Sequence, residues 1–125
     1  MFVLNEKLLK SVPMFEHGVS DTLLKTLATK MYHEIYLPGD HVIYKNDTGE
    51  EMYFIIEGGV DVMSSNEKRI TKRLRKGSYF GEQALVDCSV RPNSIITHAY
   101  SLFYVMTKLD FESTLSEYKH IKELL

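Results

Sequence analysis

A glycine, a carboxylate and an arginine lie close together late in the chain, and their chemistry suits a sugar phosphate. Gly81 and Glu82 begin a short stretch of helical composition, and Arg91 follows Glu82 by nine residues. Backbone N–H groups at the start of a helix attract an anion, and glycine lets the main chain approach a ligand closely. A carboxylate accepts a hydrogen bond from a sugar hydroxyl, and the arginine fork matches a phosphate. These residues predict a site for a ribose and its phosphate.

The spacing of these residues resembles the phosphate-binding cassette of cyclic-nucleotide-binding domains. Residues 80–85 (FGEQAL) and 91–95 (RPNSI) match the two halves of the cassette pattern. Residues 8–15, 37–43 (LPGDHVI) and 52–60 (MYFIIEGGV) resemble, in the same order, segments of this domain in cyclic-nucleotide-gated and hyperpolarisation-activated ion channels. The resemblance therefore covers nearly the whole chain.

The resemblance implies a role for each cassette position. Arg91 would pair with the exocyclic oxygens of the cyclic phosphate, with a solvated loop arginine as the alternative. Glu82 would accept a hydrogen bond from the ribose 2′-hydroxyl, or it would only stabilise the start of a helix. Gly81, Glu82 and Ala84 would present backbone donors to the ribose or the phosphate. The expected ligand-binding residues are Gly81, Glu82, Gln83, Ala84, Arg91, Pro92, Asn93 and Ser94, with Val62 and Leu74 in the base pocket.

Pro92 departs from the cassette pattern. In many related channels the residue after the arginine is threonine or serine, which offers a backbone N–H and a hydroxyl, whereas proline offers neither. Loss of one donor to a buried oxygen costs about 1–3 kcal/mol, or roughly tenfold to a hundredfold in affinity. The hydroxyl is the feature linked to cGMP binding in the family, so the resemblance favours cAMP over cGMP. Asn93 is a candidate replacement donor, and Ser94 suits a ligand contact or the cap of a strand end equally well.

Short strands between helices must position these residues. Residues 5–10 have helical composition closed by Pro13, and Ser20 is a good N-cap for a second helix with one apolar face over residues 23–31. Thr107 is a candidate N-cap for a helix over residues 108–118. The apolar residues of that last helix, available for burial, are Leu109, Phe111, Leu115 and Tyr118. Strands are predicted over residues 32–37, 42–45, 52–56, 60–64, 69–74, 94–98 and 102–106.

Many short strands at this spacing indicate a sandwich or a barrel. The resemblance narrows this to an α+β fold, in which an antiparallel, jelly-roll-like β-roll has flanking N- and C-terminal helices, with Phe80 and Leu85 in its core. We expect a single cyclic-nucleotide-binding domain over residues 1–125: helices in 1–31, the β-roll in 32–106 with the cassette at 80–95, and a C-terminal helix with the start of a lid helix in 107–125. In the family the lid helix covers the purine, and this chain is expected to stop about two turns into it.

Composition narrows the class of protein. A chain of 125 residues with 44% hydrophobic and 26% charged residues suits one soluble domain. No apolar run approaches the roughly 20 residues that span a bilayer, and the net charge of −2 gives no general attraction to nucleic acid. The basic run at residues 68–76 suits a solvated hairpin, with an acidic surface or lipid headgroups as a further partner. The single cysteine, Cys88, excludes an internal disulfide.

A metal-dependent cupin shares the jelly-roll scaffold and is the enzyme alternative. It needs clustered histidines and a carboxylate as ligands. The five histidines of this chain form no local cluster of that kind. We therefore expect no metal, no catalytic residue and no enzyme activity.

The sequence predicts a regulatory domain that binds cAMP or cGMP, needs no other cofactor and passes a conformational change to a parent protein. By resemblance the parent is a channel-like protein of the plasma membrane, with this domain on the cytoplasmic side. We expect the isolated domain to be a monomer that does not bind nucleic acid. Two alternatives stay open. One is a degenerate domain that serves as a ligand-independent interaction module, which the departure of Pro92 from the cassette pattern suggests. The other is the cupin-like enzyme.

Overall fold

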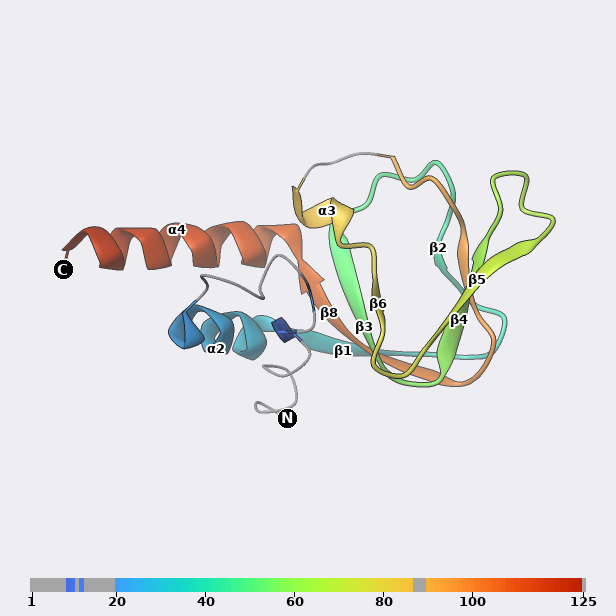
Figure 1. Cartoon of the computed structure of the whole chain (residues 1–125), viewed down its shortest axis with the longest axis horizontal. Coiled ribbons are helices and arrows are strands. Elements are labelled where there is room, and N and C mark those ends of the chain that lie inside the picture. Colours follow the sequence, from blue (N-terminus) through green and yellow to red (C-terminus); the bar gives the residue numbers. More distant parts are fainter. Residues whose placement is uncertain (1–8, 11, 13–19, 87–89, 125) are drawn as a thin grey trace.

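The computed structural model describes residues 9–10, 12, 20–86 and 90–124, with side chains as far as Lys119. The predicted helix over residues 5–10 lies mostly outside this part of the chain, as do Pro13 and Cys88. The helices are α2 (Asp21–Lys30), α3 (Gln83–Val86) and α4 (Lys108–Leu124) (Figure 1). The strands are β1 (Tyr32–Tyr36), β2 (His41–Ile43), β3 (Glu51–Glu57), β4 (Gly59–Met63), β5 (Ile70–Arg75), β6 (Tyr79–Phe80), β7 (Ile95–Thr97) and β8 (Ser101–Thr107).

The strands form two four-stranded antiparallel sheets that build a roll (Figure 1). One sheet has the order β1-β8-β3-β6, and the other has the order β2-β7-β4-β5. Their inward side chains meet in a core made of Ile43, Tyr53, Ile55, Val60, Phe80, Ile95, Phe103 and Val105. The predicted antiparallel β-roll with flanking helices is confirmed.

A second core lies between the helices and the sheet that contains β3 and β8. Ser20 caps α2 as predicted, since its Oγ accepts a hydrogen bond from the Leu23 N–H at 3.1 Å. The apolar face of this helix is buried as predicted, and it meets side chains of β3 and β8. The members of this core include Leu23, Leu24, Leu27, Ala28, Met31, Met52, Phe54, Leu85, Tyr104 and Met106.

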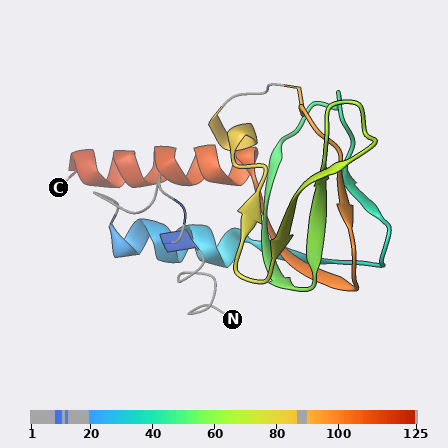
Figure 2. The same cartoon turned by 45° about the vertical axis from the view of Figure 1, so that its right-hand side comes forward.

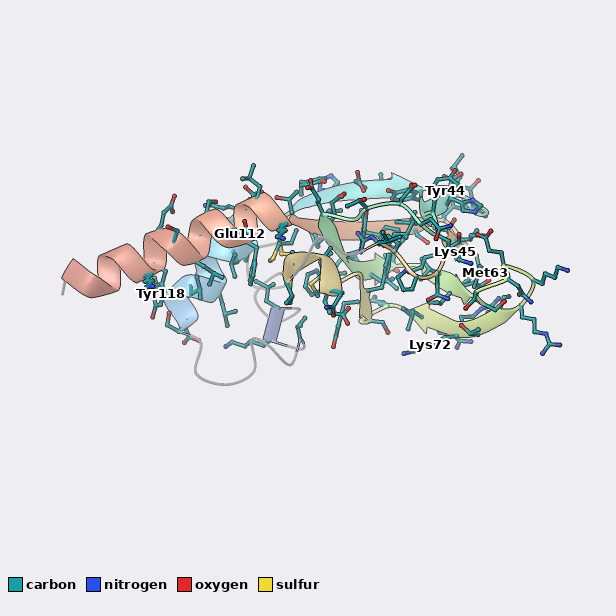
Figure 3. The ribbon with its side chains drawn as sticks, turned by 90° about the horizontal axis from the view of Figure 1, so that it is seen from above. Tyr44, Lys45, Met63, Lys72, Glu112 and Tyr118 are labelled. Carbon is teal, nitrogen blue, oxygen red and sulfur yellow. The ribbon has the colours of Figure 1, made fainter. Side chains whose placement is uncertain are left out.

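Helix α4 buries fewer apolar side chains than the sequence predicted. Its N-cap is Thr107, whose Oγ1 accepts a hydrogen bond from the Asp110 N–H at 3.1 Å. Phe111 and Tyr118 pack against the helix core, and Figure 3 shows Tyr118 beside α2. The prediction of burial is wrong for Leu109 and Leu115, which are 76% and 37% exposed. The buried stripe of α4 is narrow, and Leu109 lies on the opposite side of the helix.

The division into a C-terminal helix and the start of a lid helix is not seen. Helix α4 is continuous for 17 residues. No glycine or proline occurs between residues 108 and 124, so nothing in the sequence interrupts it. The helix leaves the roll at the end of β8 and runs away from the β2-β7-β4-β5 sheet (Figures 1 and 2).

The predicted strands correspond to β1–β5, β7 and β8, with ends that differ by at most two residues. The sequence did not predict β6, which pairs with β3 through Tyr53 and Phe80. A strand of two residues is too short to show a period, so only its pairing defines it. Its importance is positional, because it leads directly into the cassette.

Candidate functional site

The cassette turn joins β6 to α3 through Gly81. The φ angle of Gly81 is 80°, a left-handed conformation that glycine adopts without strain. A Cβ at this position would lie 3.0 Å from both the Glu51 carbonyl oxygen and Arg91 Nη1. The Ala84 N–H donates to the Gly81 carbonyl at 3.1 Å. This donor, which we expected to face a ligand, is therefore used within the turn in this structure.

Arg91 is buried beside the turn and is held by both its main chain and its side chain. Arg91 is only 8% exposed. The Arg91 N–H donates to the Asp47 carbonyl at 2.7 Å, and the Asn46 N–H donates to the Arg91 carbonyl at 2.9 Å. Arg91 Nη2 donates to the Glu51 carbonyl at 2.7 Å, and Nη1 donates to the Gly81 carbonyl at 3.3 Å. Arg91 is therefore not a solvated loop arginine, because the loop between β2 and β3 fixes it.

Arg91 and Glu82 line the same cavity, which has a volume of about 350 Å³. This volume falls within the usual range for small-molecule sites. Ile43 of β2, Val62 of β4 and Ile95 of β7 form an apolar wall. The predicted site residues that line the cavity are Val62, Gly81, Glu82, Gln83, Ala84, Arg91, Pro92 and Asn93.

Glu82 is half-buried at this cavity. Within the described residues, no side chain or backbone N–H donates to its carboxylate and no cation pairs with it. An ionised carboxylate has several acceptor positions, and a sugar hydroxyl is a suitable donor for them. The carboxylate is therefore placed to accept a hydrogen bond from a ligand.

A wider cavity of about 580 Å³ adjoins the first and shares Val62, Gly81, Glu82 and Ile95 with it. Leu74 lines this second cavity, together with Lys72 from the same strand. Leu74 and Val62, the two residues predicted for the base pocket, thus share a cavity, but only Val62 also reaches the cavity of Arg91.

Ser94 lies apart from both cavities. It is 1% exposed, and its Oγ accepts from the Lys45 N–H at 2.9 Å and donates to the Glu67 carboxylate. Asn93 lines the first cavity, but its Nδ2 donates to the Met63 carbonyl at 2.8 Å. Figure 3 shows Lys45 and Met63 close together at the end of the roll far from α4. The Ser94 hydroxyl and the Asn93 Nδ2 group are therefore engaged within the protein.

Several residues around the cavities were not predicted. Ile43 and Ile95 look like ordinary strand residues in the sequence, and Lys72 belongs to a basic run. Glu51 acts through its carbonyl, which every residue has, so no sequence signal marks it. Gly49 follows the polar residues 46–48, but a glycine after such residues indicates only a turn.

Tyr53 lies on the other side of Arg91, where both line a small cavity of about 140 Å³. Burial raises the pKa of the Tyr53 hydroxyl. The Glu51 and Glu34 carboxylates raise that pKa further, whereas Arg91 lowers it. The Tyr53 ring stacks on Phe80, the first cassette residue, with centroids 4.9 Å apart and planes 9° apart. A neutral aromatic pair thus supports the cassette from inside the roll.

The sequence profile of the family described as "Cyclic nucleotide-binding domain" matches residues 33–118. The chain belongs to the cyclic nucleotide-binding domain family. The matched residues include both sheets of the roll from His33 onward, the cassette and the first part of α4.

The curated relatives of this cyclic nucleotide-binding domain include ion channels. Potassium/sodium hyperpolarization-activated cyclic nucleotide-gated channel 2 of Mus musculus is 33% identical over 112 residues, which are 90% of this chain and 13% of the channel. The corresponding channel 4 of Oryctolagus cuniculus is also 33% identical over 90% of this chain, and 9% of that channel is covered. The chain therefore spans a small part of the length of these relatives.

A solved structure with a similar fold is that of a cyclic nucleotide-binding-like protein from Brucella abortus. The TM-score is 0.79, the sequence identity is 17%, and the match covers 90% of this chain and 97% of the other. This comparison supports the same arrangement of roll and helices in this cyclic nucleotide-binding domain.

Two negative findings apply to the described part of the domain. Its residues hold no group of three or more His, Cys, Asp or Glu side chains arranged for a metal ion. None of its helices is both long enough and apolar enough to cross a membrane.

Proposed function

We propose that the domain binds a cyclic nucleotide monophosphate, cAMP in preference to cGMP, in the cavity beside the cassette. The observation that carries the proposal is that Arg91 and Glu82 line one cavity with an apolar wall. A guanidinium, a carboxylate acceptor and apolar side chains match the phosphate, ribose and base of one ligand.

The phosphate would take its charge partner from Arg91. Two of the five guanidinium N–H groups bind the Glu51 and Gly81 carbonyls, so the guanidinium keeps further donors for the ligand. Gly81 has no side chain to obstruct the approach of the phosphate, and Glu82 would accept from the 2′-hydroxyl. Val62 and Leu74 would cover the base in the adjoining cavity.

The preference for cAMP rests on Pro92. The residue lines the cavity next to Arg91, and it offers neither a backbone N–H nor a hydroxyl. In the family a hydroxyl at this position favours cGMP, so its absence favours cAMP.

Ligand binding would regulate a channel-like parent from the cytoplasmic side of the plasma membrane, without catalysis. The names of the relatives support this role, since both are cyclic nucleotide-gated channels. The structure offers a route for the signal, because α3 of the cassette contacts α4. A ligand shifts such a coupled arrangement only by the difference in its affinity for the two states.

Calorimetric titration with cAMP and with cGMP tests the proposal. We expect both nucleotides to bind, and cAMP to bind more tightly than cGMP. We expect Arg91→Ala to weaken binding by about tenfold to a hundredfold, because a hydrogen bond to a charged group is worth about 1.5–3 kcal/mol. Arg75→Ala is the matched control, since Arg75 is exposed and lines neither of the two adjoining cavities; its affinity should equal that of the parent chain.

Absence of binding would favour the other functions. No heat and no chemical-shift change in residues 81–94 at millimolar nucleotide would defeat the sensor role and favour a ligand-independent interaction module. Equal affinity for Arg91→Ala and the parent chain would remove Arg91 from the phosphate site. Stoichiometric metal in the purified protein would favour the cupin-like enzyme.

A further inference from the structure

Gly49 leaves the space that the guanidinium of Arg91 occupies. The glycine is buried in the loop between β2 and β3. A Cβ built on it would lie 1.8 Å from Arg91 Nε, 2.0 Å from Cζ and 2.4 Å from Nη2. The three nearest atoms all belong to the guanidinium of Arg91. A side chain at position 49 would therefore overlap the space that this guanidinium occupies.

The backbone does not explain the glycine at this position. Gly49 is not among the glycines with a positive φ, which in the described residues are Gly39, Gly58, Gly77 and Gly81. Its φ therefore lies outside the left-handed region that favours glycine. The contact that a side chain at position 49 would make with Arg91 accounts for the glycine.

The same loop and the first residue of β3 hold other groups of Arg91. The Glu51 carbonyl accepts from Nη2, and the Asp47 carbonyl accepts from the Arg91 N–H. From the opposite side, the Gly81 carbonyl accepts from Nη1. The guanidinium therefore lies between Gly49 and Gly81, with its direction fixed by two carbonyls.

We propose that Gly49 is a positioning residue for the cyclic nucleotide: its missing side chain creates the seat that aims the Arg91 guanidinium at the ligand phosphate. The inference rests on the proposed function, since it assigns the phosphate contact to Arg91. A methyl group at position 49 would displace the end of a flexible side chain, which can move into the cavity that Arg91 lines. The fold therefore tolerates the change, while the preorganised direction of the guanidinium is lost.

A double-mutant cycle in the full chain tests this with cAMP as the probe. We expect Gly49→Ala to weaken binding by about tenfold or more, approaching the loss in Arg91→Ala. In the Arg91→Ala background the same change should alter affinity by less than about twofold, because no guanidinium remains to be displaced. Thr48→Ala is the matched control: it changes an exposed side chain of the same loop and should bind like the parent chain.

The Arg91 Nε–H resonance gives a second readout that needs no ligand. It should exchange slowly with water in the parent chain and in Thr48→Ala, and rapidly in Gly49→Ala. Parent-like affinity or parent-like exchange in Gly49→Ala would overturn the proposal, as would an equal loss of affinity in both backgrounds. Failure of the parent chain to bind cAMP or cGMP would instead defeat the proposed function, while the exchange measurement would still decide whether the seat exists.

Discussion

Pro92 is the residue at the cavity that limits the number of donors to a phosphate. It lies exposed at the rim, next to Arg91. We expect Pro92→Thr to bind cGMP about tenfold more tightly than the parent chain, because threonine adds a backbone N–H and a hydroxyl at the same place. Calorimetric titration with cGMP and cAMP measures the change.

Pro92→Ala separates the two new donors. Alanine adds the N–H without the hydroxyl, so it should strengthen the binding of cAMP and of cGMP by the same factor. A selective gain for cGMP should appear only with threonine. Equal or weaker cGMP binding by Pro92→Thr than by the parent chain would contradict this account of the proline.

Side-chain type decided which site residues could be predicted from the sequence. Arg91 and Glu82 were recognisable because a guanidinium and a carboxylate carry their chemistry in the side chain. The carbonyl of Glu51 and the empty space at Gly49 carry no such mark, although both determine where the guanidinium lies. Ser94 shows the opposite case, since its side chain suggested a ligand contact that the structure does not show. Its hydroxyl forms hydrogen bonds with the Lys45 N–H and the Glu67 carboxylate, and only the folded structure reveals these partners.

The turn between β4 and β5 is tied to the end of the cassette by one serine. Ser94 Oγ bonds the Glu67 carboxylate in that turn and the Lys45 N–H after β2, and its carbonyl accepts from the Met63 N–H at 2.9 Å. Glu67 has a φ of 61°, so the turn holds a left-handed residue at this contact. Ser94 thus joins three segments that are far apart in the sequence.

Removal of this hydroxyl should affect stability more than binding. We expect Ser94→Ala to lower the free energy of unfolding by about 1–2 kcal/mol, because the Lys45 N–H loses its acceptor. The affinity for cAMP should change by less than about threefold, since Ser94 lines neither of the two adjoining cavities. Urea unfolding and calorimetry measure the two quantities. Glu67→Gln keeps an acceptor oxygen for the Ser94 hydroxyl, so it should lower the free energy of unfolding by less than Ser94→Ala does. A large loss of cAMP affinity in Ser94→Ala at unchanged stability would place Ser94 in the ligand site.

The helices show how far a periodic pattern predicts burial. The apolar face of α2 is buried throughout, because it packs against α4 and against side chains of β3 and β8 in the helix core. In α4 the pattern marked Leu109 and Leu115 as available for burial, but the neighbours of α4 cover only the stripe of Phe111 and Tyr118. A pattern names the side chains that can be buried, whereas the extent of the partner decides which of them are.

The cassette spans the two cores of the molecule. Phe80 belongs to the core inside the roll, and Leu85 belongs to the core under the helices. Both burials agree with the sequence prediction. A ligand that moves the cassette would therefore act on the packing of the roll and, through Leu85, on the layer that includes α2 and α4.

The buried Tyr53 and the half-buried Tyr36 link the stability of the roll to alkaline pH. Burial raises the pKa of the Tyr36 hydroxyl, and its hydrogen bond to the Glu34 carboxylate at 2.9 Å raises that pKa further. Burial likewise raises the pKa of Tyr53. Because the folded state holds these protons more tightly than the unfolded chain, the stability they confer is complete below about pH 10, the ordinary tyrosine value, and is lost as the pH rises above it.

The free energy of unfolding should therefore fall from about pH 10 upward, and Tyr53→Phe should make that fall less steep. Phenylalanine keeps the ring that stacks on Phe80 but cannot ionise, so one source of the pH dependence disappears. Urea unfolding at a series of alkaline pH values gives the slope, and the ultraviolet absorbance of tyrosinate reports the ionisation itself. Tyr100→Phe is the matched control, because Tyr100 is 72% exposed and should leave the slope unchanged. An identical slope for Tyr53→Phe and the parent chain would show that Tyr53 ionises equally in both states.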